Sequence, residues 1–304
     1  MTEMKLLKNK VLVVGANGLL GQKLVHTFLG DYEVYGCSIE GETFIQPEGY
    51  HYSQMDITSR RTTAERIKHL QPTCIVNAAA YTNVDACEDD REVCWKVNVN
   101  GAENLAIAAK GVRAFFVHVS TDYVFDGVAG VYTETSRPNP LGYYGKSKLA
   151  GENAVIGTGA EYAIARTMVL YGTGENLRLN FATWLVDQLS KGESVNIVDD
   201  QYGHPTIVDD LAAAIRKIVE LRRQGLFHVT GAEYVNRYEF AVKLAGIFGF
   251  DSSLIKRIKT ADLAQKAPRP MNSAFSLAKL AAETGVEMRD VESGLRLLKT
   301  QLGY

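Results

Sequence analysis

Short apolar runs alternate with segments of helical periodicity through the first half of this chain. Residues 11–14 (Val-Leu-Val-Val) form a β-branched run typical of a strand buried on both faces, and residues 20–28 repeat apolar side chains at helical spacing. Further strands are expected at 33–38, 74–77, 114–119 and 162–166, and further helices at 90–109 and 144–154. Alternation of this kind predicts an α/β fold, a Rossmann-type doubly wound parallel sheet covered by helices.

The pattern becomes irregular after residue 170. Helical segments are expected at 181–191 and 209–223, and short strands at 195–198 and 226–229. We predict a dinucleotide-binding domain over 1–170, with a sheet completed by later segments near 203–230. Residues 171–304 are predicted to form mainly a smaller, interleaved α/β substrate-binding domain. The cleft between the two parts is the expected ligand site.

Composition narrows the function classes. Of 304 residues, 46% are apolar and 22% charged, which is ordinary for a globular protein. The net charge of −2 argues against a nucleic-acid or membrane-surface role, and no apolar run is long enough to span a bilayer. The chain leads into its first strand without a secretory segment, and its four cysteines lack metal-type or C-x-x-C spacing. We expect a cytoplasmic protein with reduced thiols and no metal.

A glycine-rich turn follows the first strand. Its spacing is G-x-x-G-x-x-G, and a helical pattern begins directly after it. A strand, a tight turn and a helix bring free backbone N–H groups and the positive helix end together, which suits a pyrophosphate. The alternative is a turn whose glycines serve packing only. The residues expected to contact a dinucleotide here are Gly15, Asn17, Gly18, Leu19, Leu20 and Gly21.

The end of the second strand bears on the choice of dinucleotide. An acidic residue there would bind the ribose of NAD, but the chain has Ser38 followed by Ile39 and Glu40, with no carboxylate at the expected spot and no arginine after it. We therefore favour NADP(H), with NAD(H) as the alternative. Asp56 and Ile57 are candidates for the adenine edge, although Asp56 could equally cap a helix.

Tyr144 and Lys148 are the leading catalytic candidates. They lie four residues apart in a predicted helix, so the phenol and the ammonium project from one face. A nearby cation is expected to lower the tyrosine pKa from about 10, giving an acid or base that works near neutral pH. With 15 tyrosines in the chain, the pair could equally belong to an ordinary solvated helix face.

Small and polar side chains follow two other strands. Ala78, Ala79 and Ala80 would let a nicotinamide ring and its ribose approach the backbone. Thr121 would place a hydroxyl at a strand end, where strand termination is the alternative role.

Carbonyl reduction divides the chemistry among these residues. Hydride transfer creates an alkoxide that needs a proton from Tyr144, while Thr121 donates a hydrogen bond to the developing oxyanion. Lys148 stabilises phenolate and can bind the nicotinamide ribose. Asn98, on a central helix, either braces the backbone or a water near the lysine or is a structural amide.

The chain resembles the extended short-chain dehydrogenases/reductases, and among them the dTDP-4-dehydrorhamnose reductase family, over nearly its full length. The matching runs lie at 76–85, 120–127, 140–152, 200–206 and 267–273. The resemblance implies NADPH, sometimes NADH, reducing the 4-keto group of a dTDP-linked deoxysugar, and it implies a homodimer. It makes Thr121, Tyr144 and Lys148 the catalytic triad and places Thr82, Tyr123 and Arg269 near the substrate.

One position departs from the family pattern. Val169 stands where a tryptophan is usual against the sugar, which removes stacking area and reshapes the pocket. A 4,6-dehydratase is disfavoured because Tyr123 replaces the acidic residue that eliminates water, and a 4-epimerase usually has a larger substrate domain. The alternative from another class is a non-catalytic, NADP-binding regulatory subunit resembling the methionine adenosyltransferase β-subunit, which also lacks the tryptophan. A reductase or epimerase of another nucleotide sugar is the remaining alternative.

Overall fold

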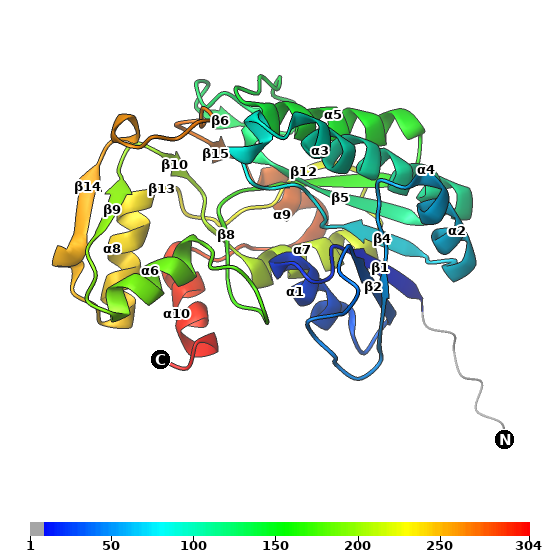
Figure 1. Cartoon of the computed structure of the whole chain (residues 1–304), viewed down its shortest axis with the longest axis horizontal. Helices are drawn as coiled ribbons and strands as arrows, with labels where there is room; N and C mark the ends of the chain where they lie inside the picture. Colours follow the sequence, from blue (N-terminus) through cyan, green and yellow to red (C-terminus); the bar gives the residue numbers. More distant parts are fainter. Residues whose placement is uncertain (1–8) are drawn as a thin grey trace.

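The computed structural model describes residues 9–304, in which a parallel sheet forms the centre of the larger lobe (Figure 1). Within these residues, seven strands pair in the order β12-β7-β5-β4-β1-β2-β3, and every pairing is parallel. In that order the strands are Gly225–His228, Tyr162–Thr167, Phe115–Thr121, Cys74–Asn77, Lys10–Val14, Glu33–Ser38 and Tyr50–Gln54. The predicted α/β doubly wound sheet is confirmed.

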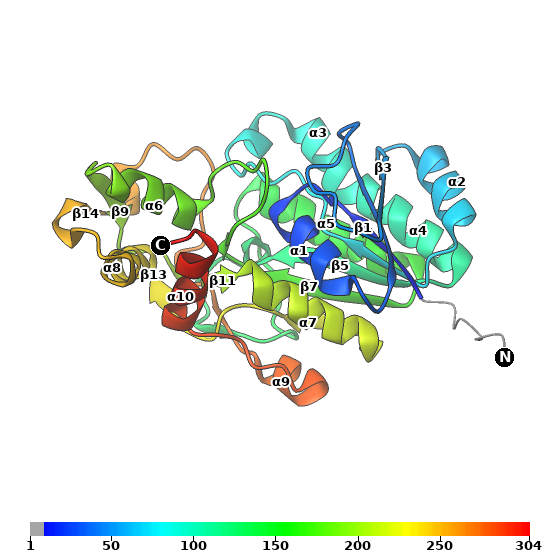
Figure 2. The same ribbon diagram turned by 90° about the horizontal axis from the view of Figure 1, so that it is seen from below.

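The sheet is covered by helices on both faces (Figures 1 and 2). Successive side chains of a strand point to opposite faces, so Val11 and Val13 join one apolar core while Leu12 and Val14 join another. The first core includes α1 (Leu19–Phe28), α7 (Val208–Glu220) and α9 (Ala278–Thr284). The second includes α2 (Arg60–Leu70), α4 (Ala102–Val112) and α5 (Tyr143–Thr158).

A smaller lobe lies beside the sheet, at the left of Figure 1. Its core joins α6 (Phe181–Ser190), α8 (Arg237–Phe248) and α10 (Val291–Gln301) to the pair β9 (Val195–Val198) and β14 (Ile255–Ile258). Three further two-stranded pairs are β6 (Val131–Tyr132) with β15 (Ala274–Phe275), β8 (Leu170–Tyr171) with β11 (Thr206–Ile207), and β10 (Tyr202–Gly203) with β13 (Val235–Asn236). Helix α7 and strand β12 return from this lobe to the central sheet. The division into two domains at residue 170 stays a prediction.

The helix expected over 90–109 is interrupted. The structure has α3 (Arg91–Trp95), then a π-helical stretch (Lys96–Gly101), then α4. The buried amide of Asn98 lies in the π stretch and bonds outside its own helix. Wider turns of this kind are rare and occur mostly at functional sites.

The strand order reverses between β1 and β4. The chain runs from β1 to β2 and β3 on one side, and from β4 to β5 and β7 on the other. Val14 at the end of β1 pairs with both Cys37 and Asn77, so the carboxyl ends of three strands meet. In open α/β sheets, ligands bind beyond the carboxyl ends of the strands at such a reversal.

His228 should make the protein less stable in mild acid. Its ring is fully buried and stacks 3.8 Å from the ring of Phe275, and burial lowers its pKa to about 3. The unfolded chain therefore binds a proton below about pH 6.5 that the folded chain does not, which costs about 1.4 kcal/mol of stability per pH unit.

Urea unfolding between pH 7 and pH 5 measures this dependence. His228→Phe keeps an aromatic ring and should reduce the slope by about that amount, whereas His26→Gln, at an exposed site on α1, should leave it unchanged. An unaltered slope in His228→Phe would show that other groups cause the loss of stability.

Candidate active site

The glycine turn after β1 touches the loop after β4. Gly15 has φ +79°, and a Cβ added to it would lie 2.7 Å from the backbone nitrogen of Ala79. A Cβ on Gly21 would lie 2.0 Å from the carbonyl oxygen of Gly15, so α1 packs directly on the turn. Gly18 is the N-cap residue of α1. Because it has no side chain to accept a hydrogen bond, the first N–H groups of the helix face the turn without a side-chain cap. This geometry suits the predicted pyrophosphate contacts of 15–21.

Asn17 connects the glycine turn to the end of β2. Its backbone N–H donates to Ser38 Oγ (3.1 Å), and its Nδ2 donates to Glu40 Oε2 (3.2 Å) and to the carbonyl oxygen of Glu42 (2.9 Å). The end of β2 itself carries Ser38 and no carboxylate, as the sequence indicates, but the loop after β2 folds back and brings Glu40 to Asn17. A carboxylate in this loop suits a ribose hydroxyl and disfavours a 2′-phosphate.

The two adenine candidates have structural partners. Asp56 Oδ1 accepts hydrogen bonds from the N–H (2.9 Å) and the hydroxyl (2.8 Å) of Thr58, just before α2. Ile57 is buried and packs against Gly101, whose absent Cβ would lie 2.6 Å from Ile57 Cδ1. Asp56 forms a local turn with Thr58 and does not cap α2, whose N-cap residue is Ser59. The adenine contact stays a prediction.

Asn98 braces the loop after β4 against α5. Its Oδ1 accepts from the N–H of Tyr81 (2.8 Å), while its Nδ2 donates to the carbonyl oxygen of Tyr81 (3.2 Å) and to Ser147 Oγ (3.0 Å). The half-buried Ala78, Ala79 and Ala80 come directly before this brace. The amide thus sets how far the loop after β4 lies from the helix that carries Tyr144.

Thr121, Tyr144 and Lys148 converge at the carboxyl end of β5. Thr121 ends the strand, its hydroxyl donates to Asp122 Oδ1 (3.1 Å), and it lies close enough to Tyr144 near the start of α5 to oppose the rise in the pKa of the phenol that burial causes. One turn further along α5, Lys148 Nζ donates to the carbonyl oxygen of Val119 (2.7 Å). All three predicted catalytic side chains are buried.

The pKa of Tyr144 differs from the sequence expectation. Burial raises the pKa of the phenol above its usual value of 10, and the charge of Asp122 raises it further, while the hydrogen bond with Thr121 acts in the opposite direction. The expected lowering by Lys148 is therefore wrong for this state, in which the ammonium donates to a backbone carbonyl instead. Burial also lowers the pKa of Lys148 to about 8, against the opposing effect of Glu152.

A buried ion pair beneath the site was not predicted. Arg166 on β7 donates through Nη2 to Glu152 Oε2 (2.6 Å) and through Nε to Oε1 (2.9 Å), and Ser120 Oγ donates to the same Oε1 (2.5 Å). Glu152 lies one turn after Lys148 on α5, so this network fixes the catalytic helix to β5 and β7. The four-residue spacing between Lys148 and Glu152, which places both on one face of the helix, is the feature of the sequence that could have pointed to Glu152.

The second wall of the cleft comes from the smaller lobe. A cavity there is lined by 12 residues, among them Tyr123, Val169, Tyr202, Arg237 and Pro270. The rings of Tyr123 and Tyr144 meet edge to face with centroids 5.4 Å apart, so this cavity adjoins the catalytic group. Val169 has φ +46°, a conformation that strains a β-branched residue.

Arg237, the first residue of α8, was missed by the sequence analysis. Its charge acts on both Asp122 and Tyr123, and its guanidinium also lies 5.1 Å from the Phe181 ring centroid. A single arginine in a polar segment carries no sequence signal, because only the packing of α8 against the cleft brings it to the site.

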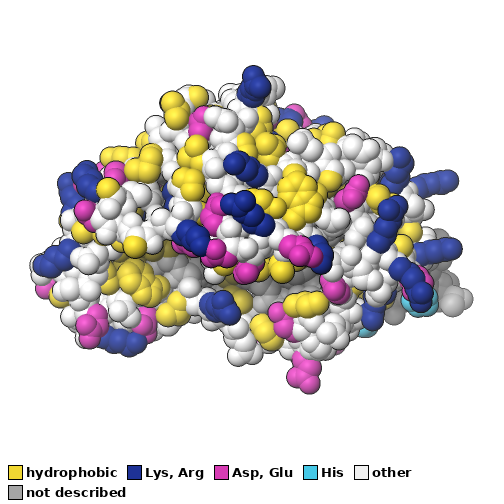
Figure 3. Space-filling view, turned by 45° about the horizontal axis from the view of Figure 1, so that its top comes forward, with side chains coloured by type: hydrophobic (Ala, Val, Ile, Leu, Met, Phe, Trp, Pro, Cys, Tyr) yellow, Lys and Arg dark blue, Asp and Glu magenta, His cyan; other side chains and the backbone are white. Residues whose placement is uncertain are grey.

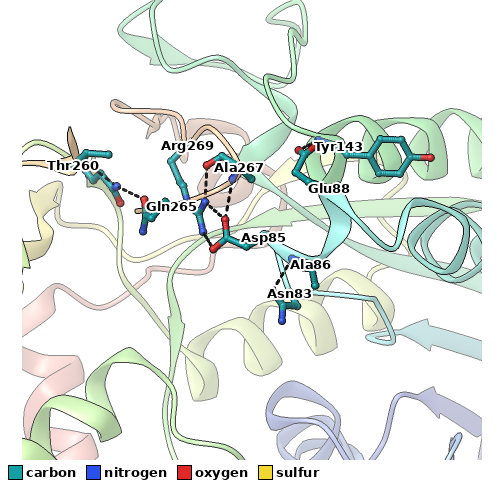
Figure 4. A network of polar contacts seen from close by, with 10 residues as sticks. Asn83, Asp85, Ala86, Glu88, Tyr143, Thr260, Gln265, Ala267 and Arg269 are labelled. Carbon is teal, nitrogen blue, oxygen red and sulfur yellow. Dashed lines mark hydrogen bonds and ion pairs between the residues drawn. The ribbon is translucent and has the colours of Figure 1, made fainter. Parts of the chain in front are cut away.

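Arg269 and Thr82 were both predicted near the substrate, and neither is among the residues that line this cavity, although Pro270 follows Arg269. Arg269 Nη1 and Nη2 donate to Asp85 Oδ1 (2.6 Å) and Oδ2 (2.7 Å), as Figure 4 shows. The charge of Arg269 also acts on Tyr123, where it opposes the rise in the pKa of the phenol that burial causes. Thr82 is exposed in the loop after β4, three residues before Asp85.

A model of the family described as the RmlD substrate binding domain matches residues 9–303. The chain belongs to the RmlD family. It is 34% identical to the probable low-salt glycan biosynthesis reductase Agl14 of Haloferax volcanii over 292 residues, covering 94% of this chain and 96% of the relative. It is 35% identical to methionine adenosyltransferase 2 subunit beta of Xenopus tropicalis over 278 residues, covering 89% and 81%.

A solved structure extends the likeness to three dimensions. The dTDP-4-dehydrorhamnose reductase of Bacillus anthracis in complex with NADP superposes with a TM-score of 0.88 at 31% identity, covering 97% of this chain and all of that one. The RmlD family membership confirms the resemblance drawn from the sequence motifs.

Among residues 9–304, no helix combines the length and the apolar character that crossing a membrane requires. The same part of the chain contains no group of three or more His, Cys, Asp or Glu side chains arranged to hold a metal ion.

Breaking the buried pair under α5 should be costly. Glu152→Gln leaves the guanidinium of Arg166 buried without a counter-charge, which is expected to lower the free energy of unfolding by about 3–5 kcal/mol in urea titrations. Glu65→Gln removes the same charge from an exposed pair with Arg61 and should change it by less than about 1 kcal/mol. Equal effects of the two substitutions would contradict the anchoring role of Glu152.

Proposed function

We propose that this protein is an NADP(H)-dependent reductase of the 4-keto group of a nucleotide-linked deoxysugar, with NAD(H) as the alternative cofactor. The observation that carries the proposal is the placement of Thr121, which ends β5, beside Tyr144 at the start of α5, close enough for its hydroxyl to oppose the rise in the pKa of the phenol that burial causes. A hydroxyl and a phenol held together there, one strand from the reversal between β1 and β4, form a proton donor and an oxyanion donor beside a dinucleotide site.

The turn after β1 fits a dinucleotide. Residues 15 and 21 must be glycine to avoid backbone contacts under 3 Å, and the start of α1 directs N–H groups to the turn. The structural relative from Bacillus anthracis holds NADP on the same fold, which supports NADP(H) here. The nearby carboxylate of Glu40 supports NAD(H) as the alternative.

The residues divide the reaction between them. The reduced nicotinamide supplies the hydride. Tyr144 supplies the proton, and its raised pKa keeps the phenol protonated at neutral pH, which is the form that reduction of a ketone needs. Thr121 donates a hydrogen bond to the carbonyl oxygen as negative charge develops on it. Lys148 places a cation beneath the site and binds the nicotinamide ribose.

The smaller lobe provides the sugar-nucleotide side of the cleft. Arg237 and Arg269 both act on Tyr123, so two guanidinium groups are available to an anionic diphosphate. A dTDP-linked 4-ketosugar is the leading substrate, because the family motifs around the cleft are those of dTDP-4-dehydrorhamnose reductases. Val169 in place of tryptophan makes another nucleotide-linked ketosugar the second choice, and the similarity to Agl14 favours a substrate from glycan synthesis.

A regulatory subunit is the second candidate function. The identity to the methionine adenosyltransferase β-subunit and the shared lack of the tryptophan favour it. The complete Thr121, Tyr144 and Lys148 group favours an enzyme. NADPH consumption with a panel of nucleotide-linked 4-ketosugars separates them, since a regulatory subunit would bind cofactor tightly and turn over none of the panel.

Tyr144→Phe tests the proton donor. It keeps the ring and its contact with Tyr123 but removes the hydroxyl, so turnover of the best ketosugar should fall on the order of 10²–10⁴-fold. The affinity for NADPH, measured by fluorescence titration, should stay nearly unchanged. Turnover close to that of the wild type would assign the acid to another group.

Glu40→Gln tests the cofactor preference. It removes the charge beside Asn17 while keeping the side-chain length, so the ratio of kcat/KM for NADPH to that for NADH should rise on the order of tenfold. Glu42→Gln is the matched control, because this exposed residue of the same loop contacts Asn17 through its backbone only. A ratio that both variants leave unaltered would remove Glu40 from the cofactor site.

A further inference from the structure

Residues 264–271, here called the strap, connect three parts of the molecule around the substrate cleft. At one end, Gln201 Nε2 of the smaller lobe approaches Gln265 Oε1 (3.4 Å). At the other, the N–H of Tyr202 donates to the carbonyl oxygen of Met271 (2.8 Å), and a Cβ added to Gly127 would lie 2.7 Å from the nitrogen of Met271. Between these ends the strap meets the loop after β4 (Figure 4).

Asp85 makes the central attachment of the strap. Its carboxylate accepts both Nη groups of Arg269 and also the backbone N–H of Ala267 (2.9 Å). Arg269 Nη1 donates in turn to the carbonyl oxygen of Ala267 (2.5 Å). The guanidinium is thus held in one orientation by a bidentate pair and by its own backbone, in a segment stiffened by Pro268 and Pro270.

The ion pair between Asp85 and Arg269 persists over the ordinary pH range. The hydrogen bonds from Arg269 lower the pKa of Asp85 to about 2, so the carboxylate is ionised at any pH at which the protein would work. The Arg269 side chain is only 11% exposed, which limits screening by salt. A second pair on the strap, Lys266 with Asp89, has both side chains more than half exposed and contributes little.

Figure 3 shows acidic and basic side chains gathered at the middle of the molecule, above a hollow.

The guanidinium has donors left over on the side of the catalytic group. Asp85 and Ala267 use three of its five N–H groups, and its charge acts on Tyr123. Tyr123 packs edge to face on Tyr144, and Pro270 of the strap lines the same cavity as Tyr123. The remaining donors of Arg269 therefore lie next to two residues of the cavity wall, Tyr123 and Pro270.

We propose that Asp85 is a positioning residue that holds the strap closed over the cleft and orients Arg269 toward the diphosphate of the nucleotide sugar. The inference rests on the proposed function for the identity of the ligand. Asp85 itself touches the strap and not the ligand. Without its carboxylate the strap loses its central attachment and Arg269 its fixed orientation, so substrate binding weakens while the proton donor stays in place.

Limited trypsin digestion reports on the strap without any turnover. Trypsin cleaves after Lys266 but not after Arg269, because a proline follows it. We expect Asp85→Asn to be cleaved after Lys266 on the order of tenfold faster than the wild type. Thymidine diphosphate should slow cleavage of the wild type and should act on Asp85→Asn only at higher concentration. Glu92→Gln, which removes the same charge from an exposed pair with Lys96 that does not involve the strap, should change the cleavage rate far less.

Steady-state kinetics give the second readout. Asp85→Asn should raise KM for the nucleotide sugar on the order of tenfold, with kcat and the affinity for NADPH nearly unchanged, while Glu92→Gln should leave all three as in the wild type. Wild-type cleavage and KM in Asp85→Asn would overturn the proposal. A loss of kcat and of cofactor affinity together would overturn it as well, since it would show general damage to the fold.

The two experiments separate this inference from the proposed reaction. If the wild type reduces no nucleotide sugar, but thymidine diphosphate protects Lys266 and Asp85→Asn loses that protection, the reductase proposal fails and the role of Asp85 stands. If the wild type is an active reductase and Asp85→Asn behaves like it in both assays, only the role of Asp85 fails.

Discussion

The close approach of two turns at the centre of the sheet is the constraint on which the site depends. The turn after β1 reaches the loop after β4 because Gly15 has no Cβ to collide with Ala79. From that loop, Asn98 and Ser147 continue the chain of contacts to α5. The distance between the dinucleotide turn and the catalytic tyrosine is therefore set by backbone packing and one buried amide. Larger side chains at 15 or 21 would separate these elements before any chemistry is affected.

Burial explains the electrostatics of the catalytic group. A charged phenolate is poorly solvated beneath the loops, so Tyr144 stays protonated, and a buried lysine loses part of its preference for the charged form. The carboxylate of Glu152, itself neutralised by Arg166, offsets the cost for Lys148. The helix that carries Tyr144 is thus anchored by a buried ion pair. Removing either partner would leave the other charge isolated. The site suits proton donation to a ketone better than it suits a tyrosinate base.

The smaller lobe decides which molecule is presented to this group. The cavity there combines Arg237, the ring of Tyr123 against Tyr144, and a strained Val169. A β-branched residue with positive φ is retained only where the surrounding structure enforces it, and here its carbonyl oxygen accepts the N–H of Thr206 from β11 (3.2 Å). The RmlD relatives include both reductases and a subunit of another enzyme.

The sequence by itself predicted the parallel sheet, except its polar edge strand β3, and the proposed catalytic group. Apolar runs located the buried strands, because parallel strands covered on both faces must be continuously apolar. The motifs pointed to Thr121, Tyr144 and Lys148, because local spacing brings these residues to one strand end and one helix face. Only the tertiary structure decided the contacts between segments distant in the chain. These include the return of Glu40 to Asn17, the buried pair of Glu152 and Arg166, the placement of Arg237 and the attachment of Arg269 to Asp85. It also reversed the expected pKa shift of Tyr144, because burial depends on what packs around the phenol and a spacing of four residues carries no information about that.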